Sequence, residues 1–254
     1  MHALEALAIG AAAVAAGGIN AVVGSGTLIT FPTLLAFGYP PVLANVTNTV
    51  GLVPGVLSAV YGYRRELKGQ GGRLLKLGAA SLIGGIAGAL LLLRLPSGAF
   101  DAIVPALILT ACALVVLQPR LSRRVQARQD ARGEHRADGG PALWLGVLGT
   151  GVYGGYFGAA QGVLLMGLLG SALRDGLQRL NGVKNVLAGL VNGVASVVFV
   201  AVAEIDWAAA GVIAVGSALG GLLGARLGRR LPPVALRGLI VVVGVTASIG
   251  MLVG

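Results

Sequence analysis

Two apolar stretches of this chain carry uncharged side chains that can donate hydrogen bonds to a small anion. These residues lie in segments 44–51 (ANVTNTVG) and 180–189 (LNGVKNVLAG), and they are Asn45, Thr47, Asn48, Asn181 and Asn185. The asparagines within each segment are spaced i, i+3 or i, i+4, which puts them on one face of a helix. Such stripes have two explanations, contact between neighbouring helices or the lining of a polar cavity. Their repetition in two halves favours a shared cavity.

Lys184 adds a positive charge to the second segment. It is the only basic side chain inside a segment that starts a membrane crossing without belonging to a charged loop, and no acidic residue is expected near it. An unpaired lysine at membrane depth is costly and is a candidate for function. The alternative is that its long side chain reaches back to the cytoplasmic interface, since it lies only one turn into its helix.

Gly-rich segments lie next to both stripes: GSGTLITFP at 24–32, with Ser25 and Thr27, and GAAQGVLLM at 158–166, with Gln161. Gly-rich backbone at membrane depth is tolerated where it lines a cavity, and helix N-termini that point into the cavity attract anions. Close helix packing explains the glycines equally well. The chain has no HExxH, CxxC, Walker or Ser–His–Asp pattern, so we expect no enzyme activity, no metal site and no cofactor.

The elements that hold these residues occur twice. GGIAGALLLLRLP at 84–96 returns 136 residues later as GGLLGARLGRRLP at 220–232, with eight of thirteen positions identical. Internal duplication of apolar, Gly-rich segments is typical of membrane transporters. We therefore predict a first transmembrane repeat at 1–118, a charged cytoplasmic linker at 119–141 and a second repeat at 142–254.

Composition indicates a multi-pass helical protein of the cell inner membrane. The chain is 56% hydrophobic and 11% charged, whereas soluble domains are about a quarter charged. Full crossings are predicted where apolar runs approach the roughly 20 residues that a helix needs to span the bilayer: 41–63, 73–95, 99–118, 180–203, 207–228 and 233–253. The first ten residues contain no Lys or Arg, so we expect no cleaved signal peptide.

The net charge of +10 does not predict nucleic-acid binding, because the basic residues gather in three segments between crossings. These segments, 64–76, 119–141 and 226–237, are therefore expected in the cytoplasm. The turn at 204–206 carries two acids and no base and is expected outside. Since 64–76 and 204–206 are equivalent turns of the two repeats, the repeats are predicted to have inverted topology.

The first block of each repeat, 3–38 and 143–173, is predicted to be a broken helical hairpin that starts and ends on one side of the membrane. Each half is expected to be about 14–17 residues, or roughly 21–25 Å of helix, which is short of the ~30 Å hydrocarbon core. A re-entrant or strongly tilted hairpin follows, and two short full crossings are the alternative. Each repeat would then be a hairpin plus three transmembrane helices.

At these residues the chain resembles the sulfite exporter (TauE/SafE) family of membrane transporters. The resemblance covers nearly the whole chain outside the linker and is carried by segments 24–51, 61–67, 152–165, 180–189 and 224–232. It implies a transporter of sulfite, organosulfonates or related sulfur oxyanions, mostly in the export direction. Ser25 and Gln161 stand where family members often have glycine.

The function that we expect is secondary export of a small sulfur oxyanion by alternating access. Lys184 would supply charge, the five polar residues of segments 44–51 and 180–189 would donate hydrogen bonds, and Ser25, Thr27 and Gln161 would line the hairpin turns. The expected partners are this anion and the lipid bilayer, and a homodimer is compatible with the sequence. Two alternatives stay open: a membrane binding or assembly protein that transports nothing, and uptake of another small anion.

Overall fold

The structure is a computed structural model that describes residues 2–132, 140–227, 238, 240–246 and 248–249. Within these residues all regular secondary structure is helical, as predicted, and residues 240–246 are helical too. The helices before residue 228 are α1 (Ala3–Val22), α2 (Thr27–Ala36), α3 (Pro41–Gly62), α4 (Gly71–Arg94), α5 (Ser97–Arg132), α6 (Gly140–Tyr156), α7 (Gln161–Ala172), α8 (Leu177–Val202) and α9 (Trp207–Leu227).

Six of these helices contain a stretch long and apolar enough to cross a membrane: α1, α3, α4, α5, α8 and α9. The predicted crossings at 41–63, 73–95, 99–118, 180–203 and 207–228 agree with five of them to within a few residues. The predicted crossing at 233–253 and most of the basic segment 226–237 fall largely outside the described residues.

Local sequence explains several helix ends. Helix α3 begins with proline at its first position and follows Pro40, where the fixed φ and missing N–H of proline cost nothing. Helix α4 ends at Arg94, two residues before Pro96. Asp206 precedes α9, and its Oδ1 accepts a hydrogen bond of 2.9 Å from the Ala209 N–H, which is an N-cap.

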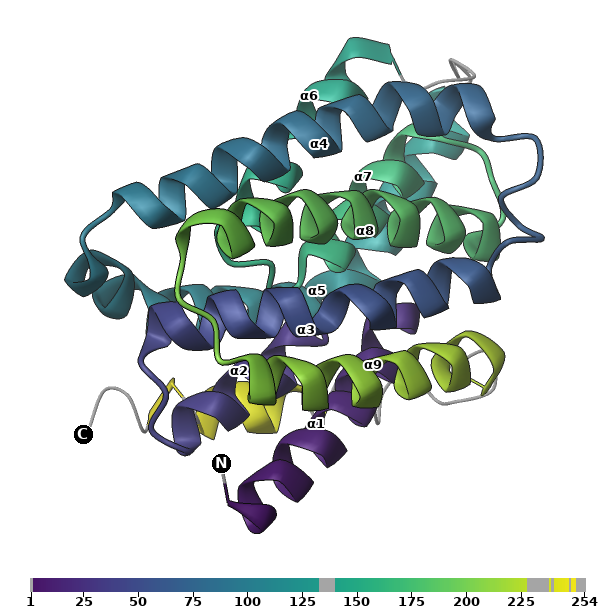
Figure 1. Ribbon diagram of the computed structural model, residues 1–254. Coiled ribbons are helices and arrows are strands. Elements are labelled where there is room, and N and C mark those ends of the chain that lie inside the picture. The colour runs from purple at the N-terminus through teal and green to yellow at the C-terminus, as the bar shows by residue number, and fades with distance from the viewer. Residues whose placement is uncertain (1, 133–139, 228–237, 239, 247, 250–254) are drawn as a thin grey trace.

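The helices pack mainly between the two halves of the chain (Figure 1). Helix α1 lies against α9, and α4 lies against α6. Helices α3 and α8 contact each other at the centre, where α3 also contacts α9 and α8 also contacts α4. Neither half therefore buries its helices alone.

Glycines allow α9 to pack closely against α1, and α4 to pack closely against α6. A Cβ atom on Gly220 of α9 would lie 2.0 Å from the Val14 carbonyl oxygen of α1, and a Cβ on Gly88 of α4 would lie 2.0 Å from the Val152 carbonyl oxygen of α6. No side chain fits at such distances, so these glycines set how closely the helices pack.

The two hairpins have unequal halves, which corrects the predicted 14–17 residues for each half. The first hairpin has 20 residues in α1 and 10 in α2, and the second has 17 in α6 and 12 in α7. Helix α1 is rich in alanine, the best helix former, and it continues through Gly10, Gly17 and Gly18 without interruption to Val22. Only α1 among these four helices is long enough to cross a bilayer.

Each hairpin begins and ends at one end of the bundle. Tyr39, just after α2, donates a hydrogen bond of 3.0 Å to Glu5 near the start of α1. In the second hairpin, Trp144 near the start of α6 and Asp175 just after α7 both contact residues in the first turns of α4. The turn of each hairpin therefore lies inside the bundle.

The charged linker that we predicted at 119–141 is helical wherever the structure describes it. Helix α5 continues through residues 119–132, and only 133–139 of the linker fall outside the described residues. Arginine, glutamine and alanine are good helix formers, and several of them follow Gln118. They extend the helix in spite of Pro119.

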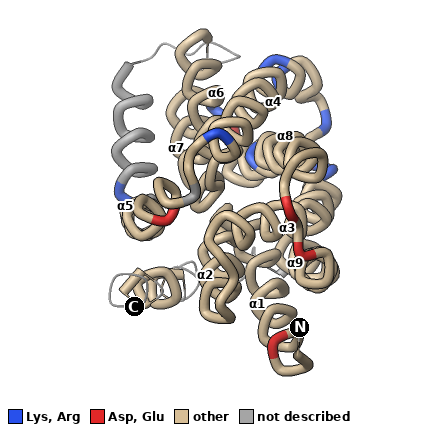
Figure 2. Tube along the Cα trace, turned by 60° about the vertical axis from the view of Figure 1, so that its left-hand side comes forward, with Lys and Arg blue, Asp and Glu red and all other residues tan. Residues whose placement is uncertain are grey.

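Charges separate along the bundle (Figure 2). Lys and Arg gather in the loop between α3 and α4, and acids lie near the start of α1 and before α9. At the basic end Asp175 forms ion pairs with Arg73 and, at 3.1 Å, with Arg179. Burial alone would raise the pKa of Asp175, but hydrogen bonds and positive charge from the two arginines lower it overall. This ion pair joins the α7–α8 loop to α4.

Candidate functional site

The turns of the two hairpins meet inside the bundle. The Gly162 N–H donates a hydrogen bond of 3.0 Å to the Gly24 carbonyl oxygen. A Cβ atom on either glycine would lie 2.4 Å from the Cα of the other. Gly24 and Ala160 have positive φ values of 86° and 59°, which turn the chain sharply into α2 and α7. The starts of α2 and α7 are thus brought together.

The polar stripe of α3, which includes Asn45 and Asn48, forms hydrogen bonds with both hairpins. Asn45 donates a hydrogen bond of 2.9 Å to the carbonyl oxygen of Tyr156, the last residue of α6. Asn48 donates to Thr27 Oγ1 at 3.4 Å and accepts a hydrogen bond from Thr30 Oγ1. All of these side chains are buried. Helix α3 therefore holds the end of one hairpin helix and the start of another.

The polar stripe of α8 holds the C-terminal end of α1. Lys184 Nζ donates hydrogen bonds of 3.1 and 3.3 Å to the carbonyl oxygens of Asn20 and Ala21. Asn181 and Asn185 each donate to the Ala21 carbonyl at 3.2 Å. The last carbonyls of a helix lack partners within the helix and carry the negative end of its dipole. They are the counter-charge that the sequence did not reveal for Lys184.

Lys184 does not reach the cytoplasmic interface, which corrects the alternative considered from the sequence. Its side chain is 0% exposed. A lysine ammonium has three N–H donors, and the described contacts of Lys184 use two of them. The third donor has no partner among the described residues.

The 136-residue offset relates the two stripes position by position. Asn45 corresponds to Asn181, and each donates to a carbonyl in the last turn of a hairpin helix from the other half of the chain. Asn48 corresponds to Lys184. At this position the two halves differ, because one presents an amide and the other an ammonium.

Several buried polar atoms near the turns have no hydrogen-bond partner among the described residues. Ser25 Oγ and Gln161 Nε2 are two of them, in side chains that are 1% and 3% exposed. Asn45 Oδ1, Asn181 Oδ1 and the Tyr156 hydroxyl are others. Leaving a buried donor or acceptor unpaired costs about 1–3 kcal/mol, so polar groups without partners next to two helix starts fit a place for a polar ligand.

Eight of the nine predicted site residues gather around the two hairpin turns, and Thr47 does not. Thr47 Oγ1 instead accepts a hydrogen bond of 3.2 Å from the backbone N–H of Asp206 in the α8–α9 loop. Sequence reasoning missed Thr30 and Tyr63, whose hydroxyl accepts a hydrogen bond of 2.8 Å from Asn181. Thr30 stands i, i+3 from Thr27, which was the available signal.

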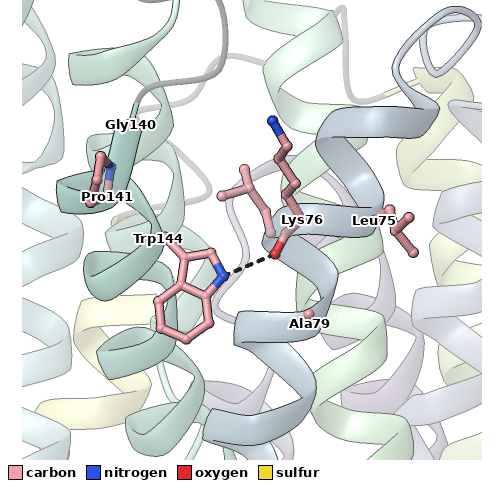
Figure 3. A pocket seen from close by; sticks show the side chains of 7 residues that line it. Leu75, Lys76, Ala79, Gly140, Pro141 and Trp144 are labelled. Atoms are coloured by element: carbon pink, nitrogen blue, oxygen red, sulfur yellow. Dashed lines mark hydrogen bonds between the residues drawn. The ribbon is translucent and has the colours of Figure 1, made fainter.

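The site is closed in this conformation, since the nine predicted residues are between 0% and 8% exposed. Three of the cavities lined by described residues lie away from it. One of about 580 Å³ lies between the starts of α4 and α6, where Trp144 Nε1 donates a hydrogen bond of 3.1 Å to the Lys76 carbonyl (Figure 3). The described residues also contain no group of three or more His, Cys, Asp or Glu that could hold a metal ion.

Comparison with known proteins gives the family. Residues 9–251 match the sulfite exporter TauE/SafE family. The chain belongs to this family. It is 29% identical over 248 residues to the probable membrane transporter protein YfcA of Escherichia coli (strain K12), covering 94% of this chain and 87% of that protein. A probable membrane transporter protein of Haemophilus influenzae is 27% identical over 212 residues, covering 82% of this chain and 79% of the relative.

The chain is also 33% identical over 114 residues to the probable membrane transporter protein ORF9 of a Sinorhizobium species. This match covers 43% of this chain and 42% of that protein. No solved structure matches. Family membership and the six candidate spans make the chain a multi-pass membrane protein of a transporter family.

Proposed function

We propose that this chain exports a small sulfur oxyanion, such as sulfite or an organosulfonate, by alternating access. The observation that carries the proposal is the meeting of the two hairpin turns beside Lys184, a buried cation that has no acidic partner among the described residues. An anion bound there would meet one ammonium N–H, and the unpartnered Ser25 and Gln161 side chains lie beside the same turns. The description of the family favours sulfite and the export direction.

In this proposal the site favours an anion over a cation for electrostatic reasons. The described residues around the turns contribute one positive charge and no carboxylate. The starts of α2 and α7 add the positive ends of two helix dipoles. The lack of a carboxylate among them argues against a dedicated Asp/Glu proton relay at this depth, so substrate protonation or the membrane potential would drive export. The anion would leave unchanged, and the proposal assigns no catalytic residue.

Flux measurements test the substrate. Purified protein in liposomes should accelerate movement of radiolabelled sulfite, or of a sulfonate derived from taurine, above that of empty liposomes and across a pH step. Sulfate is the comparison anion. No flux above empty liposomes for any of these would favour the non-transporting alternative, and flux of another anion inward would favour the uptake alternative.

Ser25→Ala is the matched variant for this assay. Because Ser25 Oγ has no hydrogen-bond partner in the described structure, alanine removes no hydrogen bond from the empty protein. We expect an unchanged melting temperature and a KM raised by about tenfold to a hundredfold, since one hydrogen bond to a charged ligand contributes about 1.5–3 kcal/mol. An unchanged KM would remove Ser25 from the site.

We further propose that residues 1–118 and 142–254 are two inverted repeats joined by 119–141. The packing between the halves supports this, because the 136-residue offset makes α1 equivalent to α6 and α4 equivalent to α9. Helix α1 packs against α9, and its equivalent α6 packs against α4 in the same way. The matching donors Asn45 and Asn181 support it too. Inverted repeats that rock about a shared site are a known route to alternating access.

Cysteine labelling tests this topology. Lys68 and Glu204, in equivalent turns of the two repeats, are both exposed. With Cys112 replaced by alanine, we expect a membrane-impermeant maleimide to label Lys68→Cys and Glu204→Cys from opposite sides of sealed vesicles. Labelling of both from one side would contradict inverted topology.

A further inference from the structure

A small cavity at the basic end of the bundle lies between the two halves of the chain. Its volume is about 330 Å³, and it lies between the ends of α3 and α9. Its lining includes six side chains from these two helices and from the loop after α3: Tyr61, Arg64, Arg65, Glu66, Leu222 and Arg226. Three arginines and one glutamate give this lining a net charge of +2. The cavity is therefore suited to an anion.

Close packing of α3 and α9 fixes the shape of the cavity. A Cβ atom on Gly62 would lie 2.3 Å from the Cβ of Ala225, so no residue larger than glycine fits where the two helices meet. The chain turns just after this point, and the Arg64 guanidinium lies over the Tyr61 ring, 4.2 Å from its centroid. Arg64 also donates a hydrogen bond of 3.0 Å to the Tyr61 carbonyl. These contacts hold Arg64 beside the cavity.

Arg65 and Arg226 bring positive charge to the cavity from opposite halves of the chain. Both side chains are exposed, and neither forms a hydrogen bond or an ion pair with a described residue. A guanidinium presents five N–H donors in a planar fork, which matches the paired oxygens of a phosphate group. Two such groups at one cavity can bind a phosphate from two sides.

The 136-residue offset shows that these charges are not needed for helix packing. It relates Arg65 to Ala201 at the end of α8, and Arg226 to Leu90 of α4. Helices α8 and α4 contact each other as their equivalents α3 and α9 do. The same helix pair therefore packs without charge at these positions in the other half of the fold. The two arginines must serve another purpose.

The helix faces next to the cavity are apolar and exposed. Leu57 lies one turn before Tyr61 on α3, and Leu219 lies one turn before Leu222 on α9. Leu57 is 58% exposed, Leu219 is 54% exposed and Tyr61 is 58% exposed. Tyrosine is typical of the level of the lipid headgroups, and exposed leucines on membrane helices face the acyl chains. A phosphate group in the cavity would thus have room for an attached apolar chain.

We propose that this cavity binds the headgroup of an anionic phospholipid, with its phosphate held by Arg65 and Arg226 and an acyl chain along Leu57 and Leu219. Basic pockets between membrane helices are known to bind such headgroups on the cytoplasmic side, where the positive-inside rule also places this end of the bundle. The bound lipid contacts α3 of one half and α9 of the other. Lipid binding here does not depend on the proposed transport function.

Native mass spectrometry of the purified full chain in a neutral detergent tests the proposal. We expect phosphatidylglycerol to bind the parent more tightly than phosphatidylcholine with the same acyl chains, because the latter has no net charge. Arg65→Gln/Arg226→Gln should weaken phosphatidylglycerol binding by about thirtyfold, since each basic residue near an anionic headgroup strengthens binding by a factor on the order of five. The melting temperature without lipid should not change, because neither arginine has a described partner.

Lys68→Gln/Arg174→Gln is the matched control. It removes the same charge from the same end of the bundle, at two exposed side chains that do not line the cavity. Because charges away from the cavity are screened by salt, this variant should bind phosphatidylglycerol within about twofold of the parent.

Three results would overturn the proposal. Equal weakening in the two double variants would mean general attraction to a basic surface. Equal affinity for phosphatidylcholine would mean that only the acyl chains bind. Displacement of the lipid by an equal concentration of glycerol phosphate would assign the cavity to a soluble phosphate. Because no transport is measured, the lipid site and the proposed function can fail separately.

Discussion

Lys184→Met should reduce sulfite flux by about thirtyfold or more at equal expression. Methionine keeps a similar apolar stem and removes only the charge and its donors. Truncating one partner of a buried charge pair typically costs at least about 2 kcal/mol of binding. The fold should survive, because the Ala21 carbonyl keeps its hydrogen bonds from Asn181 and Asn185, and because removal of a buried charge also removes its desolvation cost.

Two further substitutions separate anion binding from support of α1. Lys184→Gln retains N–H donors for the Asn20 and Ala21 carbonyls without the charge, so it should also lose flux if the charge binds the anion. Lys184→Arg keeps the charge in a bulkier planar group and should retain part of the activity. Normal flux in Lys184→Gln together with loss in Lys184→Met would make Lys184 a support of α1 and not a ligand.

The membrane-crossing helices were predictable because residues close to their ends determine where they begin. Pro40 and Pro41 fix the start of α3, and the acid before Trp207 caps α9. Apolar length then decides which segments can span a bilayer. The unequal halves of the hairpins were not predictable, because α1 mixes alanines, which favour a helix, with glycines such as Gly17 and Gly18, which disfavour one, and these opposing propensities do not fix where the helix ends.

The sequence predicted which polar residues would lie near one another, but it did not predict their hydrogen-bond partners. Side-chain type and helical spacing identified the asparagine stripes, and eight of the nine residues gather. The partner of Lys184 is backbone carbonyl, 163 and 164 residues away in the chain, and carbonyls leave no signal in residue type.

Gly162→Ala should separate the two hairpin turns and abolish transport. The added Cβ would lie 2.4 Å from the Gly24 Cα, which is far inside van der Waals contact, and the obstacle is backbone that no rotamer change can move. Parting the turns would break the hydrogen bond of 3.0 Å from the Gly162 N–H to the Gly24 carbonyl and misplace the starts of α2 and α7. Overpacking of this kind costs about 1–3 kcal/mol, so we expect a lower melting temperature as well.

Gly167→Ala, on the same helix, is the control, since a Cβ there meets nothing within 4 Å. Alanine is the better helix former by about 1 kcal/mol, so this variant should match or exceed the parent in stability and keep its flux. Gly24→Ala should be worse than Gly162→Ala, because its φ of 86° adds backbone strain of about 1–2 kcal/mol to the same clash. If Gly162→Ala transports like the parent while its melting temperature falls, the meeting of the turns stabilises the fold without forming the site, and the anion must bind elsewhere.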